Sequence, residues 1–259
     1  MKKALIIISA VFIVLGILLF AGALYIAEFD FSKFDKTIIE NKTYTVSKDF
    51  KSIEINSKET DIDFIASEDG ENKIIYAETE KIKYEISLQN GVLYINSKDD
   101  REWYDHITLF SKPLKITVYV TSDKFDTVNI SCRTGNINIK NINVDTMNIN
   151  VSTGDVKLSN INCGKITSNG STGDLYLENT VATELVKVKR STGDVKFNKS
   201  DAGEIYIKTS TGDVTGTILS DKVFKAKTST GTVQVPNSES GGKCEITTST
   251  GDIFISMSK

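Results

Sequence analysis

A short motif centred on glycine recurs seven times in the C-terminal half of the chain, and it restricts the possible folds more than any other feature. Five copies read Ser-Thr-Gly-Asp, and the glycines follow one another at intervals of 19, 19, 20, 19, 19 and 20 residues. A constant period of this length is the signature of a repeat protein. The glycines are Gly135, Gly154, Gly173, Gly193, Gly212, Gly231 and Gly251.

Apolar and polar residues alternate on both sides of each glycine. Val128 and Ile130 lie seven and five residues before Gly135, and Ile137 and Ile139 lie two and four residues after it. The other repeats follow with few exceptions, and a period of two is typical of a strand. Because the parity of the apolar positions changes at the glycine, we expect a corner there, where glycine adopts positive φ at little steric cost.

A unit of 19–20 residues cannot bury its own apolar face, whereas stacked copies can. The sequence therefore predicts an all-β fold, a single-stranded parallel β-solenoid (β-helix) with coils of 19–20 residues over residues 121–259. Long antiparallel hairpins would need a tight turn signal in every repeat, and none recurs. We expect the run from Phe254 to the C-terminus to leave an open strand edge where another strand could dock.

Residues 36–120 are predicted to form irregular leading coils and a β cap, because a solenoid needs atypical ends. Residues 57–64 echo the motif without its glycine. Asn90 and Gly91 separate two alternating runs, which predicts a type I′ hairpin, and residues 114–120 have the pattern of a further strand.

Residues 4–27 form an apolar run that is long enough to cross a bilayer as one transmembrane helix. The run exceeds the apolar core of a typical cleavable signal peptide, so it predicts a signal anchor that is retained. Residues 1–3 would then be a cytoplasmic stub and residues 28–35 a juxtamembrane linker. Cleavage near residues 21–23, followed by secretion, is the alternative.

Lys2 and Lys3 precede the apolar run and set its predicted orientation. Basic residues flanking a membrane helix stay on the cytoplasmic side. We therefore expect a single-pass protein of the cell membrane with a cytoplasmic N-terminus and an extracytoplasmic C-terminal domain.

Composition argues against catalysis and against nucleic-acid binding. The formal net charge is -3, so no strong attraction to nucleic acid is expected. The single histidine, His106, lies near Glu102, Trp103 and Asp105, but no nucleophile, phosphate loop or metal spacing accompanies this cluster. We predict that the protein is not an enzyme and holds no cofactor.

Three cysteines are too few and too scattered for a disulfide framework. Cys132 and Cys244 fall in apolar columns, which favours a role as small buried residues, and Cys163 follows Asn162 in a connecting segment.

The aspartates that follow the corner glycines form a second column. Stacked coils would bring neighbouring carboxylates within about 5 Å of one another. One hypothesis is a calcium ladder, because Ca²⁺ takes oxygen ligands. The favoured interpretation is that each aspartate caps its corner through backbone N–H groups. The calcium candidates are Asp155, Asp174, Asp194 and Asp213.

An outward set of tyrosines and lysines is a candidate binding face. Such a face could hold a glycan or an anionic wall polymer, although an ordinary solvated surface would have the same composition. Its members are Tyr176, Lys187, Lys189, Tyr206, Lys208 and Lys227.

With its anchor and its repeated Ser-Thr-Gly-Asp-Val pattern, as at residues 152–156 and 191–195, the chain resembles a bacterial family of membrane-anchored proteins. These carry the "putative adhesin" β-strand repeat domain of unknown function and include the LiaG-like proteins of cell-envelope-stress operons. The resemblance implies an extracytoplasmic parallel β-solenoid and supplies no catalytic residues. Asn136 and Thr232 replace the aspartate, and Arg190 stands where other repeats have Cys132 or Val151.

These observations predict a non-catalytic, membrane-anchored, extracytoplasmic β-solenoid, an adhesin or a cell-envelope stress accessory. Its partner would be an envelope protein or a wall polymer, and the oligomeric state is left open. One alternative is an enzyme acting on cell-wall glycans, although coils of constant length leave no long loops to wall a catalytic cleft. The other alternative is a passive structural spacer.

Overall fold

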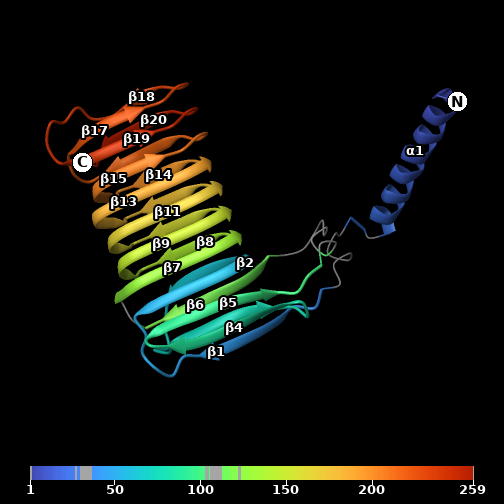
Figure 1. Cartoon of the computed structure of the whole chain (residues 1–259), viewed down its shortest axis with the longest axis horizontal. Helices are drawn as coiled ribbons and strands as arrows, with labels where there is room; N and C mark the ends of the chain where they lie inside the picture. Colours follow the sequence, from blue (N-terminus) through green and yellow to red (C-terminus); the bar gives the residue numbers. More distant parts are fainter. Residues whose placement is uncertain are drawn as a thin grey trace. The chain divides into compact units, whose positions relative to one another are not determined.

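The computed structural model describes residues 2–26, 28–29, 37–102, 105, 113–121 and 124–258. One helix, α1 (Lys2–Ile26), and twenty strands make up the described part of the chain (Figure 1). The predicted fold class is confirmed: the strands form a parallel β-solenoid, and one apolar helix precedes it in the chain.

The solenoid has two sheets, and each regular coil gives one strand to each of them. Sheet B takes the strand before the corner glycine, and sheet A takes the strand after it. Sheet B consists, in stacking order, of β4 (Ile82–Gln89), β5 (Val92–Asp99), the first half of β2 (Ser52–Ala66), β7 (Lys124–Thr134), β9 (Asn143–Thr153), β11 (Asn162–Thr172), β13 (Val181–Thr192), β15 (Asp201–Lys208), β19 (Gly242–Thr247) and β17 (Lys222–Lys227).

Sheet A stacks in the same direction. It consists of β1 (Glu40–Thr45), β3 (Lys73–Glu78), β6 (Leu114–Val120), the second half of β2, β8 (Ile137–Lys140), β10 (Val156–Ser159), β12 (Leu175–Glu178), β14 (Val195–Asn198), β16 (Val214–Ile218), β20 (Ile253–Met257) and β18 (Val233–Gln234).

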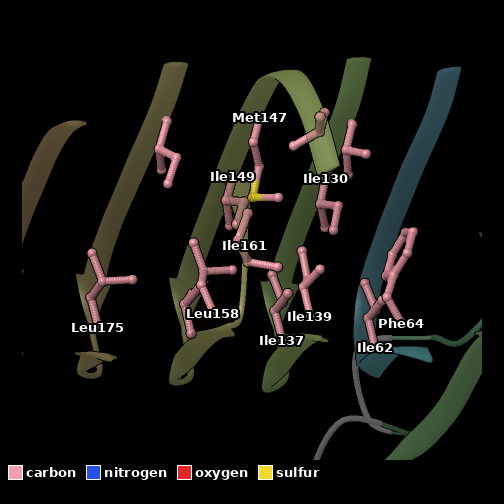
Figure 2. Packing of buried hydrophobic residues seen from close by; sticks show 14 of the residues in the cluster. Ile62, Phe64, Ile130, Ile137, Ile139, Met147, Ile149, Leu158, Ile161 and Leu175 are labelled. Atoms are coloured by element: carbon pink, nitrogen blue, oxygen red, sulfur yellow. The ribbon is translucent and has the colours of Figure 1, made fainter. Parts of the chain in front are cut away.

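The core is the row of apolar side chains between the two sheets. Figure 2 shows Ile137, Leu158 and Leu175 of successive coils turned into this interior, and each is at most 1% exposed. Full burial of one such side chain contributes roughly 1.5–3 kcal/mol, so repetition along the stack stabilises the fold.

Strands β3 to β6 close the N-terminal end of the stack. β2 pairs with β5 and β6 on one side and with β7 and β8 on the other. Antiparallel strands then cover the end, with β4 on β5, β3 on β6 and β1 on β3. The β4–β5 turn has positive φ at both Asn90 (51°) and Gly91 (76°), as a type I′ hairpin requires.

At the other end, the coils do not stack in the order of the sequence. β19 and β20 pair with β15 and β16 on one side and with β17 and β18 on the other. The last coil therefore lies between the two coils that precede it (Figure 1). The expectation that the run from Phe254 belongs to the outermost coil is wrong, because β17 and β18 form that coil; β18 is short, however, and pairs with β20 only at Ile253 and Phe254.

A buried ion pair links the coils on either side of the inserted one. Lys222 of β17 places Nζ 2.7 Å from Oδ1 of Asp201 in β15, and the two residues are 2% and 6% exposed. Gly242 of β19 pairs with Lys222, and a Cβ on this glycine would lie 3.6 Å from the Lys222 Cδ atom. The observed order keeps the two charges paired, and leaving either one buried without its partner would cost about 3–5 kcal/mol.

The corner glycines allow the coils to approach closely. Their φ values lie between 124° and 150°. A Cβ on Gly154 would lie 2.1 Å from the carbonyl oxygen of Gly135, and the other corner glycines face the next corner in the same way. The row begins at Thr60 of β2, whose carbonyl faces Gly135, so the first corner is built without a glycine.

Candidate functional site

The aspartates after the corner glycines form a hydrogen-bonded ladder along the stack. Oδ1 of Asp155 accepts the backbone N–H of Asp174 at 2.8 Å, and Oδ1 of Asp174 accepts that of Asp194 at 2.8 Å. The ladder starts at Asp61 and ends at Thr232, whose N–H donates to Asp252. Thr232 lies in the outermost coil, so no further coil offers a backbone N–H group to a carboxylate at this position. Its complete order is Asp61, Asn136, Asp155, Asp174, Asp194, Asp213, Asp252 and Thr232.

This ladder already engages one oxygen of each calcium candidate. The Asp213 N–H, with the ammonium of Lys196, outweighs partial burial and lowers the pKa of Asp194. The other oxygen of Asp174 accepts the Tyr176 hydroxyl at 2.7 Å. Within the described ranges, no group of three or more histidine, cysteine, aspartate or glutamate residues is arranged to hold a metal ion.

A second corner ends the coil, as the alternation of two short strands per repeat predicts, but the asparagines that form it six residues after Gly135, Gly154 and Gly173 were not singled out from the sequence. Asn141, Asn160 and Asn179 adopt positive φ there, and their amides hydrogen-bond from coil to coil. Asparagine tolerates this conformation better than most residues. The recurrence of asparagine at the same offset was the signal that could have singled them out.

The structure divides the predicted tyrosine–lysine face between the two sheets. Tyr176 lies on β12 of sheet A, so its grouping with the others is wrong. The remaining five residues lie on sheet B. Lys187 and Lys189 are on β13, Tyr206 and Lys208 are on β15, and Lys227 is on β17. The inserted strand β19 separates Lys227 from Lys208.

Four lysines on sheet B form what we call the lysine cluster: Lys187, Lys189, Lys208 and Lys227. All four are exposed, and none has an ion-pair partner within the described part of the chain. Lysines on sheet A differ, since Lys157 lies 3.2 Å from Glu178. Lys115 similarly lies 2.7 Å from Asp63, and Lys196 lies 3.0 Å from Asp194. The four lysines of the cluster are therefore less compensated than these three lysines of sheet A, although other lysines of sheet B, such as Lys165 with Glu184 and Lys243 with Glu245, are paired.

Tyr206 lies within the lysine cluster but is held by its neighbours. Its hydroxyl donates to Oε2 of Glu204 at 3.0 Å, and the Lys243 Nζ atom lies 4.8 Å from the ring centroid. Glu245 pairs with Lys243 at 2.8 Å, and that hydrogen bond lowers the pKa of Glu245. Tyr206 therefore orders the surface between the lysines.

Arg190 is a charged residue inside the core, 2% exposed. Its Nη2 donates to Oγ of Ser168 at 3.0 Å, whereas Nε and Nη1 have no acceptor among the described residues. A Cβ on Gly170 would lie 1.8 Å from Nη1, so the absence of that side chain makes room for the guanidinium. Burial lowers the pKa of Arg190, and Asp155 and Asp174 oppose the shift through space. The group stays protonated, as arginine does in proteins.

The remaining predicted residues show no reactive arrangement where they are described. Cys132, Cys163 and Cys244 are buried, and burial raises the pKa of the Cys163 and Cys244 thiols to about 12. In the histidine cluster, the Glu102 N–H donates to Asp105 at 2.8 Å. The other members of that cluster, Trp103, Tyr104 and His106, lie outside the described residues.

The two-sheet stack, the glycine corners and the aspartate ladder define a parallel β-solenoid repeat protein. More specifically, the chain belongs to the Toastrack DUF4097 family, whose sequence model matches residues 50–259. The predicted family is confirmed, although the matches do not single out the LiaG-like proteins within it. No curated protein matches the sequence.

Several solved structures are similar to the chain. A "putative adhesin" from Bacteroides fragilis is 15% identical with a TM-score of 0.47, over 86% of this chain and 98% of that one. A "putative cell adhesion protein" from Clostridium sporogenes is 13% identical with a TM-score of 0.41, over 85% and 100%. A "putative lipid binding protein" from Parabacteroides distasonis is 12% identical with a TM-score of 0.32, over 84% and 97%. Since all three scores are below 0.5, the family assignment depends on the sequence model.

Proposed function

We propose that this protein is a non-catalytic, membrane-anchored binding module that holds an anionic polymer of the cell envelope on the outer face of sheet B. The observation that carries the proposal is the lysine cluster, four exposed ammonium groups on one face that have no carboxylate partner among the residues the structure describes. A surface of one charge sign attracts polymers of the opposite sign and speeds their association.

The apolar helix supports the membrane anchor. Its candidate span Lys3–Ile26 has 24 residues and a mean hydropathy of 3.1. At 1.5 Å per residue it is about 36 Å long, which exceeds the hydrocarbon thickness of about 30 Å. The lysines before it favour a cytoplasmic N-terminus and an extracytoplasmic solenoid. Cleavage of the helix as a signal sequence would release the same module outside the cell.

The regularity of the coils supports binding rather than catalysis. Coil lengths of 19–20 residues leave no room for long loops beside the lysine cluster. Strands β13 and β15, which carry three of the four lysines, are fixed by parallel pairing on both sides. A rigid face loses little conformational entropy when a ligand binds, which favours affinity.

The test compares binding of short-chain polyphosphate to two sets of variants of the full-length protein in phosphatidylcholine nanodiscs. We expect Lys187→Gln, Lys189→Gln, Lys208→Gln and Lys227→Gln together to weaken binding about tenfold or more and to reduce its salt dependence. The control carries the same charge change away from sheet B. Its variants are Lys115→Gln, Lys140→Gln and Lys157→Gln on sheet A, and Lys199→Gln at the corner that follows β14. Equal weakening in both sets, or no binding by the unaltered protein, would contradict the proposal.

A further inference from the structure

A groove of about 490 Å³ runs along the outside of sheet B, beside the lysine cluster. Four neighbouring strands, β7, β9, β11 and β13, each contribute residues from the same positions just before their corner glycine. The groove therefore follows the stacking axis and crosses the strands, over about 14 Å for three strand spacings. Its lining comprises Ser57, Ser131, Cys132, Arg133, Asn150, Val151, Ser152, Asn169, Gly170, Ser171, Lys189 and Ser191.

Each wall of the groove is a row of hydroxyl or amide side chains with one cation. The cation of one wall and the cation of the other lie at opposite ends of the groove. One row runs from Ser131 through two asparagines to Lys189, and the other runs from Arg133 through serines to Ser191. Asn169 donates to Oδ1 of Asn150 at 2.9 Å, which leaves the other amide groups of this pair for a ligand. The lining contains two cationic residues and no carboxylate.

The floor of the groove adds a positive charge that has no direct carboxylate partner among the described residues, although Asp155 and Asp174 act on it through space. Gly170 belongs to the floor, and the guanidinium of Arg190 lies against the inner side of this glycine. The Nε and Nη1 groups of Arg190 are buried and have no acceptor in the described part of the chain. Water screens a buried charge less than an exposed one, so Arg190 makes the groove more attractive to anions.

We infer that this groove binds a linear anionic glycan whose chain lies parallel to the solenoid axis. The inference rests on the proposed function, because Lys189 belongs to both the groove and the lysine cluster. Hydroxyl and amide groups that recur at each coil match the repeated hydroxyls of a sugar chain. Two cations separated by three strand spacings match an acidic sugar chain, whose charges are at least one sugar ring apart, better than polyphosphate, whose charges are only one phosphate apart.

An extended peptide does not fit this groove. A peptide that binds a sheet adds to a strand edge and pairs with free backbone groups. Here the backbone groups of β9, β11 and β13 pair with strands on both sides. Only side chains are left to contact the ligand, which favours a polymer that is itself rich in hydroxyls.

The test measures binding of three probes to the full-length protein in phosphatidylcholine nanodiscs: a hexauronate from alginate, neutral chitohexaose and polyphosphate with six charges. Ser152→Trp fills the groove from its exposed wall, and Asn198→Trp places the same side chain on sheet A. We expect Ser152→Trp to weaken hexauronate binding about tenfold or more, a loss of at least about 1.4 kcal/mol. Polyphosphate binding, which uses the lysine cluster, and the Asn198→Trp control should keep their affinity.

A second variant covers the case in which tryptophan perturbs the fold. Arg133→Gln keeps the shape of the groove and should also weaken hexauronate but not polyphosphate. Unchanged hexauronate affinity in the folded groove variants would overturn the inference, and polyphosphate binding would still support the proposed function. Chitohexaose binding as tightly as hexauronate would overturn the anionic requirement. Absence of binding to all three probes would overturn both proposals.

Discussion

At the scale of single residues, the repeated motif is explained by close approach between neighbouring coils. Each corner glycine faces the carbonyl oxygen of the adjacent corner, so a side chain has no space and the backbone needs positive φ. The alternation of apolar residues was enough to predict this corner. The exceptions became clear only with the stacking order, since Thr60 starts the glycine row and Thr232 ends the aspartate ladder.

Gly193→Ala should destabilise the protein strongly. The new Cβ would lie 2.0 Å from the carbonyl oxygen of Gly173, and φ is 140°. We expect a loss of more than about 4 kcal/mol in the free energy of unfolding, measured by urea denaturation. Gly70→Ala is the matched control, because its φ of 77° is also unfavourable but its Cβ would meet open space. It should cost only about 1–2 kcal/mol, and equal losses at the two sites would refute the steric explanation.

Arg190 shows that aligned positions of the repeats cannot be interpreted one at a time. The sequence shows Ser168 and Gly170 as small residues in apolar columns and Arg190 as a large charged one. The structure joins them, because the guanidinium donates to Ser168 and occupies the space that Gly170 leaves. A period of 19–20 residues shows which residues are neighbours, but it does not show which way a long side chain turns.

At the scale of strands, the sequence predicted the register of the coils but not their order. Phe224 and Ile205 both align with Cys244, so either coil could lie next to the last one without changing a column. The order depends on contacts that periodicity does not reveal, such as the ion pair between Lys222 and Asp201. The alternation of apolar and polar residues likewise predicts which side chains point outward, but it does not predict which of the two sheets carries them. For this reason Tyr176 was grouped with the lysines of sheet B.

Engineered disulfides can test the order of the last coils. Lys208 aligns with Thr247, so the pair Lys208→Cys and Thr247→Cys should cross-link under mild oxidation. In the pair Lys208→Cys and Lys227→Cys the two positions are two strand spacings apart, or about 10 Å. That distance exceeds the Cα separation of about 7 Å that a disulfide spans. Gel mobility shifts read out both pairs, and the opposite pattern would show that the coils stack in sequence order.

At the scale of the whole molecule, the proposed function depends on where the solenoid resides and on which face meets a ligand. Cysteine labelling tests both points, because the three native thiols are buried and should not react. Ser152→Cys places a thiol in the groove, and Asn198→Cys places one on the exposed surface of sheet A.

The most direct measurement is the reaction of these two variants with a membrane-impermeant maleimide, in intact bacterial cells and in spheroplasts stripped of wall polymer. We predict that Asn198→Cys reacts in intact cells, whereas Ser152→Cys is protected until the polymer is removed. Reaction of both variants only after lysis would contradict the extracytoplasmic location. Equal reaction of both in intact cells would show that the sheet B face is unoccupied and would contradict the proposed function.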